Sequence, residues 1–255
     1  MKKVLNAWGS YLTSPASASV LDDSKSGWFG ETGITSLQSV ANVGSTSHTF
    51  DQMFQCDPSA PAHGYKSWDD FFTRLFKDDI RPIASPEDEN VVTNACESKV
   101  YKVGYHVKRR DKYWIKGQPY SVLDMLDFDP SAEQFVGGTI YQAFLSALSY
   151  HRWHSPVSGT VKKVMIVDGT YYSEPQYDDF AGNGGKDWGE DADPQGESTS
   201  QEYISCMATR GIVFIQADNE KLGLVAFIAI GMVEVSTCDV TVKEGERVKK
   251  GDQLG

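Results

Sequence analysis

The sequence predicts an α+β protein with a mainly antiparallel β-sandwich or barrel-sandwich core and an N-terminal helical leader. Residues 137–172 and 211–255 contain runs of β-branched and aromatic residues that glycines and prolines interrupt, as in strands joined by tight turns. Residues 67–77 instead place apolar side chains at helical spacing. Finally, residues 156–161 and 242–255 share a pattern of short strand-like runs separated by glycines. In the two halves of a barrel-sandwich, such glycines turn short strands back across each other.

The elements are expected in a simple order along the chain. In the leader, residues 1–64, apolar residues up to about position 50 are scattered without a sustained period, which predicts an irregular or partly helical segment. The helix at 67–77 begins at Ser67, which is followed by two acidic residues, and Arg81-Pro82 prevents its continuation. A second, short helix is expected at 121–128. Strands are expected at residues 100–107, 113–122, 211–218, 222–235 and 238–255, besides those within 137–172.

The composition excludes several classes of function. The 255 residues include 24 Lys and Arg against 35 Asp and Glu, a net charge of −11, so no nucleic-acid partner is expected. No stretch approaches the roughly 18 apolar residues of a membrane span, which predicts a soluble protein without a stable membrane anchor. The four cysteines form neither a C-x-x-C pair nor a metal-ligand spacing. We therefore expect free thiols, a cytoplasmic location and no metal site.

Two histidines, His151 and His154, stand three residues apart in the segment YHRWHSP. On a strand this spacing places the two rings on opposite faces, whereas on a turn or helix they can share a site. The spacing alone leaves open whether one ring is simply buried with a backbone partner or both take part in chemistry.

Five segments occur in an order that resembles the phosphatidylserine decarboxylase family: FFTRLFKDDIRPI, IKGQPYSVLDML, FVGGT, YHRWHSPVSGTV and IGMVEVSTCDVTVKEGERVKKGDQLG. The resemblance covers roughly residues 65–255, which we therefore expect to form the β-chain portion of a catalytic domain. In the leader and just beyond it, WGSYL, GWFG and CDPSAPAHGYKSWDDFF are similar to the branch of the family that decarboxylates free amino acids.

The resemblance implies a cofactor that the protein makes from itself. In this family a proenzyme cuts itself before a serine, and that serine becomes a pyruvoyl group at the start of a new α chain. The sequence reaches Gly255 just where the family continues toward the cut, so the pyruvoyl serine is expected outside this chain, near Gly255 in sequence. The expected partner is the protein's own α chain. A Gly-Ser-Thr at residues 44–46 precedes every family motif and is interpreted as an ordinary loop.

Three residues match family positions with roles in this chemistry. His154 resembles the base that activates the serine for self-cleavage, a role that needs a carboxylate to orient the imidazole. Glu97, in NACESKV, corresponds to the family's aspartate, while a register shifted by one residue would place Cys96 there instead. His151 resembles the histidine that returns a proton to the substrate carbon, since the ordinary histidine pKa suits proton donation near neutrality. Ser149 departs from the acidic residue that many members carry before Tyr-His-Arg.

The expected substrate is a free L-amino acid, L-tryptophan or another aromatic one. An acidic chain without an apolar anchor is repelled by anionic membrane leaflets, which disfavours a phospholipid. The polar segment 173–200 contains several aromatic residues and is interpreted either as a lid over an aromatic side chain or as a long surface loop. Two alternatives remain: a phosphatidylserine decarboxylase that acts on phospholipid, and an inactive β-sandwich binding module.

Overall fold

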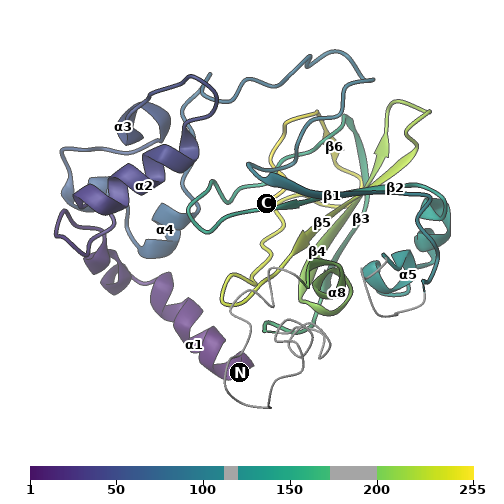
Figure 1. The fold of residues 1–255 in the computed structure, drawn as a ribbon, viewed down its shortest axis with the longest axis horizontal. Helices are drawn as coiled ribbons and strands as arrows, with labels where there is room; N and C mark the ends of the chain where they lie inside the picture. The colour runs from purple at the N-terminus through teal and green to yellow at the C-terminus, as the bar shows by residue number, and fades with distance from the viewer. Residues whose placement is uncertain (112–119, 173–199) are drawn as a thin grey trace, which may run out of the picture. The chain divides into compact units, whose positions relative to one another are not determined.

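The computed structural model describes residues 1–111, 120–172 and 200–255, which form two compact units (Figure 1). Unit 1 comprises Met1–Lys99 and Phe144–Pro156, and unit 2 comprises Val100–Ala143 and Val157–Gly255. Each unit is therefore built from two separate stretches of chain. The predicted boundary between residues 64 and 65 is not tested by this division and stays a prediction.

Unit 1 consists of short helices packed around aromatic side chains. Its elements are α1 (Lys2–Leu12), the 3₁₀ helix η1 (Pro15–Val20), α2 (Glu31–Ala41), α3 (Phe50–Met53), the 3₁₀ helix η2 (Pro61–Gly64) and α4 (Trp68–Phe72). The core is a buried cluster that includes Phe29, Phe50, Phe54 and Phe71. Phe29 meets Phe50 and Phe71 at steep angles, 74° and 80° with centroids 5.5 Å apart in both pairs, an arrangement that aromatic pairs favour. The leader is thus partly helical.

Helix α4 begins as the sequence predicts but ends early. The side chain of Ser67 accepts a hydrogen bond from the backbone N–H of Asp70, which caps the helix at its first turn. The helix stops at Phe72, and Phe76 forms a β-bridge with Phe54 instead of continuing the helical face. A contact between distant parts of the chain therefore overrides the local helical period.

Unit 2 contains a four-stranded antiparallel sheet in the order β5-β4-β3-β6. Its strands are β3 (Gly159–Val167), β4 (Arg210–Ala217), β5 (Leu224–Ile230) and β6 (Arg247–Val248). β4 is central and almost wholly buried, as expected of its continuous apolar run. β3 pairs with β6 through Gly159 opposite Val248, so the two glycine-punctuated segments identified in the sequence do come together. Together with the helices this confirms the α+β class with antiparallel sheets.

The remaining elements of unit 2 flank a second core. They are β1 (Lys99–Tyr105) and β2 (Thr139–Phe144), which pair as a two-stranded sheet, with α5 (Val122–Met125), the 3₁₀ helix η3 (Pro130–Phe135) and α8 (Gln201–Met207). A buried cluster including Leu126, Ile212 and Phe214 joins α5 to the central strand. α5 matches the predicted short helix, whereas α8 was not predicted, because its seven residues are too few to display a period.

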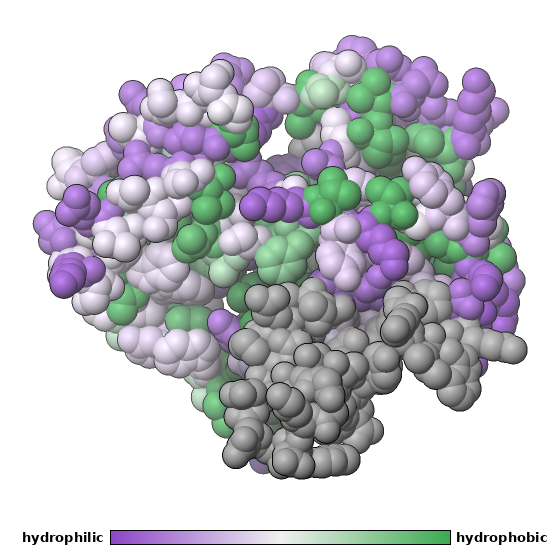
Figure 2. Space-filling view, in the orientation of Figure 1, coloured by the Kyte–Doolittle hydropathy of each residue, from purple (hydrophilic) through white to green (hydrophobic). Residues whose placement is uncertain are grey.

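Apolar side chains also remain exposed on this protein. Figure 2 shows apolar residues among hydrophilic ones on the face that it draws, and Val100 of β1 is 60% exposed. Among the helices that the structure describes, none is both long and apolar enough to cross a membrane. The predicted strand at 113–122 falls largely, and the predicted lid or loop at 173–200 almost wholly, outside the described residues.

Candidate functional site

His151 and His154 lie in an irregular segment of unit 1, neither a helix nor a regular strand. The backbone N–H of His154 donates to the carbonyl of Ala95 at 2.7 Å, which ties the histidine segment to residues 94–97. Both stretches that carry predicted site residues are therefore adjacent. Their separation in sequence, about sixty residues, explains why no local pattern reveals the contact.

The ring of His154 faces a tyrosine hydroxyl. Its Nε2 lies 3.1 Å from the hydroxyl oxygen of Tyr150, and the two rings are stacked with centroids 5.7 Å apart. Tyr150 is 5% exposed and packs on Phe76. Burial raises the pKa of the Tyr150 hydroxyl, while the positive charge of Arg152 opposes this shift and the negative charge of Glu97 adds to it. The hydroxyl therefore keeps its proton, which it can donate to an unprotonated Nε2.

The ring of His151 is held in apolar surroundings. It stacks on Phe72 with centroids 3.9 Å apart, and its Nε2–H donates to the carbonyl of Ala147 at 3.2 Å. Burial lowers the pKa of His151 to about 4, and the positive charge of Arg74 also lowers it. The imidazole is therefore neutral at pH 7, with Nδ1 as the nitrogen that can accept a proton.

The side chain of Glu97 forms an ion pair with the Nε of Arg81, and both groups are mostly buried. Burial raises the pKa of Glu97, while Arg81 and Arg74 oppose that shift. Burial likewise raises the pKa of the neighbouring Cys96 thiol, so this sulfur is a poor anionic partner for a histidine. The described contact of the Glu97 carboxylate is thus an arginine, whereas the described ring contact of His154 is Tyr150.

Arg74 is a member of this neighbourhood to which sequence reasoning assigned no role. It is only 2% exposed, and its Nη2 donates to the carbonyls of Leu148 at 2.9 Å and Ser149 at 3.3 Å. Its guanidinium also lies 4.5 Å from the ring centroid of Phe54, within cation–π distance. Burial lowers the pKa of Arg74 to about 10, which leaves it charged at pH 7. The only sequence feature that could have drawn attention to Arg74 is its position in the family-like segment FFTRLF.

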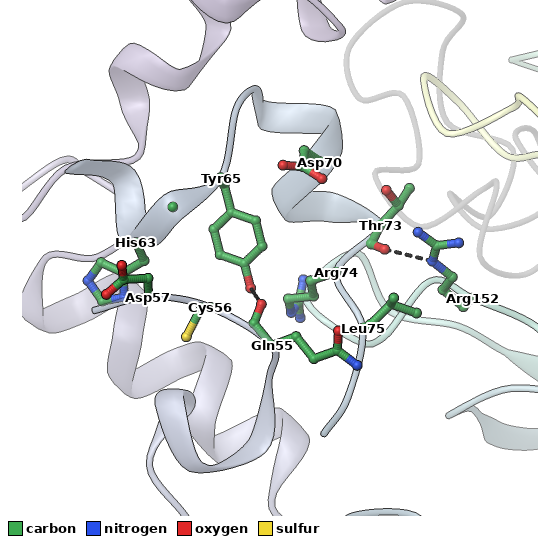
Figure 3. Close-up of a pocket in the computed structure, with 11 residues that line it drawn as sticks. Gln55, Cys56, Asp57, His63, Tyr65, Asp70, Thr73, Arg74, Leu75 and Arg152 are labelled. Atoms are coloured by element: carbon green, nitrogen blue, oxygen red, sulfur yellow. Dashed lines mark hydrogen bonds between the residues drawn. The ribbon is translucent and has the colours of Figure 1, made fainter. Parts of the chain in front are cut away.

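A pocket of about 300 Å³ opens beside these residues within unit 1 (Figure 3). Arg152, next to His151 in sequence, lies at its edge and donates its Nε to the carbonyl of Thr73 at 2.7 Å. The lining is polar and carries both signs of charge. It comprises Gln55, Cys56, Asp57, His63, Gly64, Tyr65, Asp70, Thr73, Arg74, Leu75 and Arg152.

Comparison with known families gives a match over most of the chain. A model described as phosphatidylserine decarboxylase matches residues 68–255, and a second phosphatidylserine decarboxylase model matches residues 1–37. The matched region includes His151, His154 and Glu97.

Several curated proteins are similar over the whole chain. The sequence is 45% identical to a protein of Amanita muscaria named decarboxylase iboD, over 100% of this chain and 72% of that protein. It is 42% identical to the L-tryptophan decarboxylase of Psilocybe cyanescens, over 100% of this chain and 58% of that protein. Identity to phosphatidylserine decarboxylase proenzyme 3 of Schizosaccharomyces pombe is 29%, over 76% of this chain and 18% of that protein. The chain therefore spans 58–72% of the length of these two mushroom relatives.

Proposed function

Because this chain belongs to the phosphatidylserine decarboxylase family of decarboxylases, we propose that it is the β-chain part of a pyruvoyl-dependent decarboxylase of a free L-amino acid. The proposed substrate is L-tryptophan or another aromatic amino acid. One observation carries this choice: relatives named L-tryptophan decarboxylase are 40–42% identical over the whole chain, whereas the phosphatidylserine decarboxylase proenzyme of S. pombe is 29% identical over 76% of it.

The residues at the site suit a self-made carbonyl cofactor. A serine that attacks the preceding peptide bond needs a base, and the imidazole of His154, whose Nε2 lies 3.1 Å from the Tyr150 hydroxyl, is the proposed one. Glu97 supplies negative charge in the same neighbourhood, since it influences the pKa of Tyr150. In this proposal Glu97 favours the imidazolium form of His154, and Tyr150 holds the ring in place.

His151 is proposed to handle the proton of the decarboxylation step. When bound, a pyruvoyl ketone supplies an electron sink for the carbon that loses carbon dioxide. A neutral His151 accepts a proton at Nδ1 and returns it, while Ala147 holds the opposite side of the ring. Its lowered pKa makes it a stronger acid once protonated than an ordinary histidine.

The proposal includes a partner and a location. The partner is the α chain produced by self-cleavage, in keeping with relatives that are named proenzymes. The location is the cytoplasm, because the four cysteines are unpaired thiols in the structure, as expected in a reducing compartment.

The proposal is tested by measuring the intact mass of the protein expressed from its full reading frame. We expect two chains, with the smaller one blocked by a ketone at its N-terminus. His154→Ala should remain uncut because the base acts before any cofactor exists. His151→Ala should be cut normally yet lose decarboxylation by about 10²- to 10⁴-fold, the usual size of general acid–base help.

Two results would contradict these assignments. A wild-type protein that stays a single chain excludes the pyruvoyl mechanism. Normal maturation of His154→Ala would show that His154 is not the base, even if the enzyme is a decarboxylase.

A further inference from the structure

Two residues that line the pocket in unit 1 carry the buried side-chain polar atoms that lack a hydrogen-bond partner among the described residues. These atoms are the Nε of Arg74 and the Nδ1 of His63. Buried polar atoms are nearly always paired in native proteins, since an unpaired one costs about 1–3 kcal/mol. Two such atoms at one pocket indicate that the pocket is built for something that pairs with polar groups.

The backbone of the same pocket is strained. His63 has a φ of 52° and the preceding Ala62 has a φ of 51°, left-handed values that residues with a side chain rarely adopt. The fold holds them because the His63 ring stacks on Phe29, with centroids 3.8 Å apart and planes 5° from parallel. Strain of this kind is found preferentially at ligand sites.

The charges around the pocket match a zwitterion. Arg152 uses its Nε on Thr73, and its two terminal nitrogens have no partner among the described residues, so they are available as a fork for a carboxylate. Arg74 adds a second positive charge, and no described carboxylate lies within ion-pair distance of it. Figure 3 shows Asp70 on the same side of the pocket as Thr73 and Arg152. One oxygen of Asp70 accepts the backbone N–H of Lys66, and the other is available to an ammonium group.

We propose that this pocket binds a free α-amino acid, with the ligand carboxylate on Arg152 and the ligand ammonium on Asp70. A volume of about 300 Å³ accommodates even an aromatic amino acid. Tyr65 and Leu75 are the more apolar residues of the lining, and the ligand side chain would contact one of them.

The charges of this pocket suit holding an amino acid rather than decarboxylating it. Decarboxylation needs the amine free to react and the carboxylate free to lose its charge. An aspartate would keep the amine protonated and unable to attack a ketone, and an arginine fork would stabilise the carboxylate charge that is lost on decarboxylation, so both contacts favour the ground state over the transition state. The pocket is therefore proposed as a holding or effector site for an amino acid.

The test is isothermal titration calorimetry on the protein expressed from its full reading frame and treated with borohydride, which reduces any ketone and prevents turnover. Three probes separate the two charges: L-tryptophan, tryptamine, which lacks the carboxylate, and indole-3-propionate, which lacks the ammonium. We expect L-tryptophan to bind at least about tenfold more tightly than either analogue, since each analogue leaves a charged group of the pocket unpaired.

Matched variants place the ligand in the pocket. Asp70→Asn keeps the acceptor for Lys66 but loses the charge, and it should weaken L-tryptophan binding about tenfold or more. Asp69→Asn changes a carboxylate on the same helical turn that does not line the pocket, and it should leave affinity unchanged. Arg152→Gln should weaken L-tryptophan binding but not tryptamine binding.

Equal affinity for the three probes, or no binding of L-tryptophan up to about 10 mM, would overturn the proposal. Unchanged affinity in both Asp70→Asn and Arg152→Gln would place the ligand elsewhere and also overturn it. The outcome is independent of the proposed function, because an uncut and inactive chain can still be titrated.

Discussion

At the residue scale, variants of the Glu97–Arg81 ion pair distinguish two roles of the Glu97 carboxylate: favouring the imidazolium of His154 and holding the local structure. Glu97→Gln should slow self-cleavage strongly, because a neutral amide no longer favours the imidazolium of His154. Arg81→Gln removes the same ion pair but leaves the carboxylate, so maturation should stay close to normal. Both variants should lose about 1 kcal/mol of unfolding free energy. Maturation is followed by the appearance of two chains on a denaturing gel.

Cys96→Ser serves as the register control for this prediction. The variant should mature at nearly the normal rate. If it stops maturation while Glu97→Gln does not, residue 96 occupies the family position. Equal slowing in Glu97→Gln and Arg81→Gln would instead mean that the ion pair acts only by holding the local structure.

The pKa of His151 predicts a defined pH dependence of stability. Its folded-state pKa of about 4 lies below the ordinary value of 6.5. Between these two pH values the unfolded chain therefore binds a proton at His151 that the folded chain does not bind. The contribution of His151 to the free energy of unfolding is fully present above pH 6.5. It is lost as the pH falls toward 4, at up to about 1.4 kcal/mol per pH unit. His151→Phe, which retains the stacking on Phe72, should show a shallower slope in urea unfolding across this range. Parallel curves for the two proteins would contradict the burial of the His151 ring.

The site could be predicted from the sequence only in part. The spacing of His151 and His154 drew attention to their segment, because two histidines three residues apart stand out in any chain. The sequence did not indicate the contacts of Tyr150 or Arg74. The Tyr150 hydroxyl meets His154 in an irregular stretch of backbone, and the Arg74 guanidinium donates to carbonyls 74 and 75 residues away. No local period contains such information.

At the scale of elements, replacing two glycines by alanine should have opposite effects on stability. A Cβ at Gly159 in β3 would lie 2.2 Å from the carbonyl oxygen of Gln216 on β4, so Gly159→Ala should destabilise the protein by about 1–3 kcal/mol. Gly9 lies in α1 with no atom within 4 Å of the corresponding position, so Gly9→Ala should stabilise by about 0.5–1 kcal/mol. Chemical unfolding followed by circular dichroism measures both. A loss of stability in Gly9→Ala would show that α1 is not helical in solution.

Elements with long β-branched runs were predictable, and those set by distant contacts were not. β4 and β5 follow directly from apolar runs bounded by glycine or polar residues. Helix α4 ends five residues short of its predicted limit because Phe76 pairs with Phe54, and Arg74 turns toward Leu148. The helical spacing remained correct for burying Phe71 and Phe72, which explains why the pattern was present at all.

At the scale of the whole molecule, the net charge of −11 predicts that the substrate is dissolved in water rather than held in a membrane. Repulsion from anionic leaflets should prevent this chain from sedimenting with phosphatidylserine vesicles at low salt. Carbon dioxide release should therefore be observed with dissolved L-tryptophan and without detergent. Release from detergent-dispersed phosphatidylserine, with none from L-tryptophan, would instead support the phospholipid alternative suggested by the family's name.

The interleaving of the two units has a consequence for how the protein takes shape during synthesis. Residues 144–156 complete unit 1 only after residues 100–143 have been made, and they contribute Tyr150 to its aromatic cluster. At about 5–20 residues per second, the first 99 residues wait roughly 3–11 s for this segment to be translated. The same segment carries His151 and His154, so a nascent chain that lacks it also lacks both histidines of the proposed site. In the proposed self-cleavage, folding would set the time of the cut, because the core that positions the two histidines has to close first.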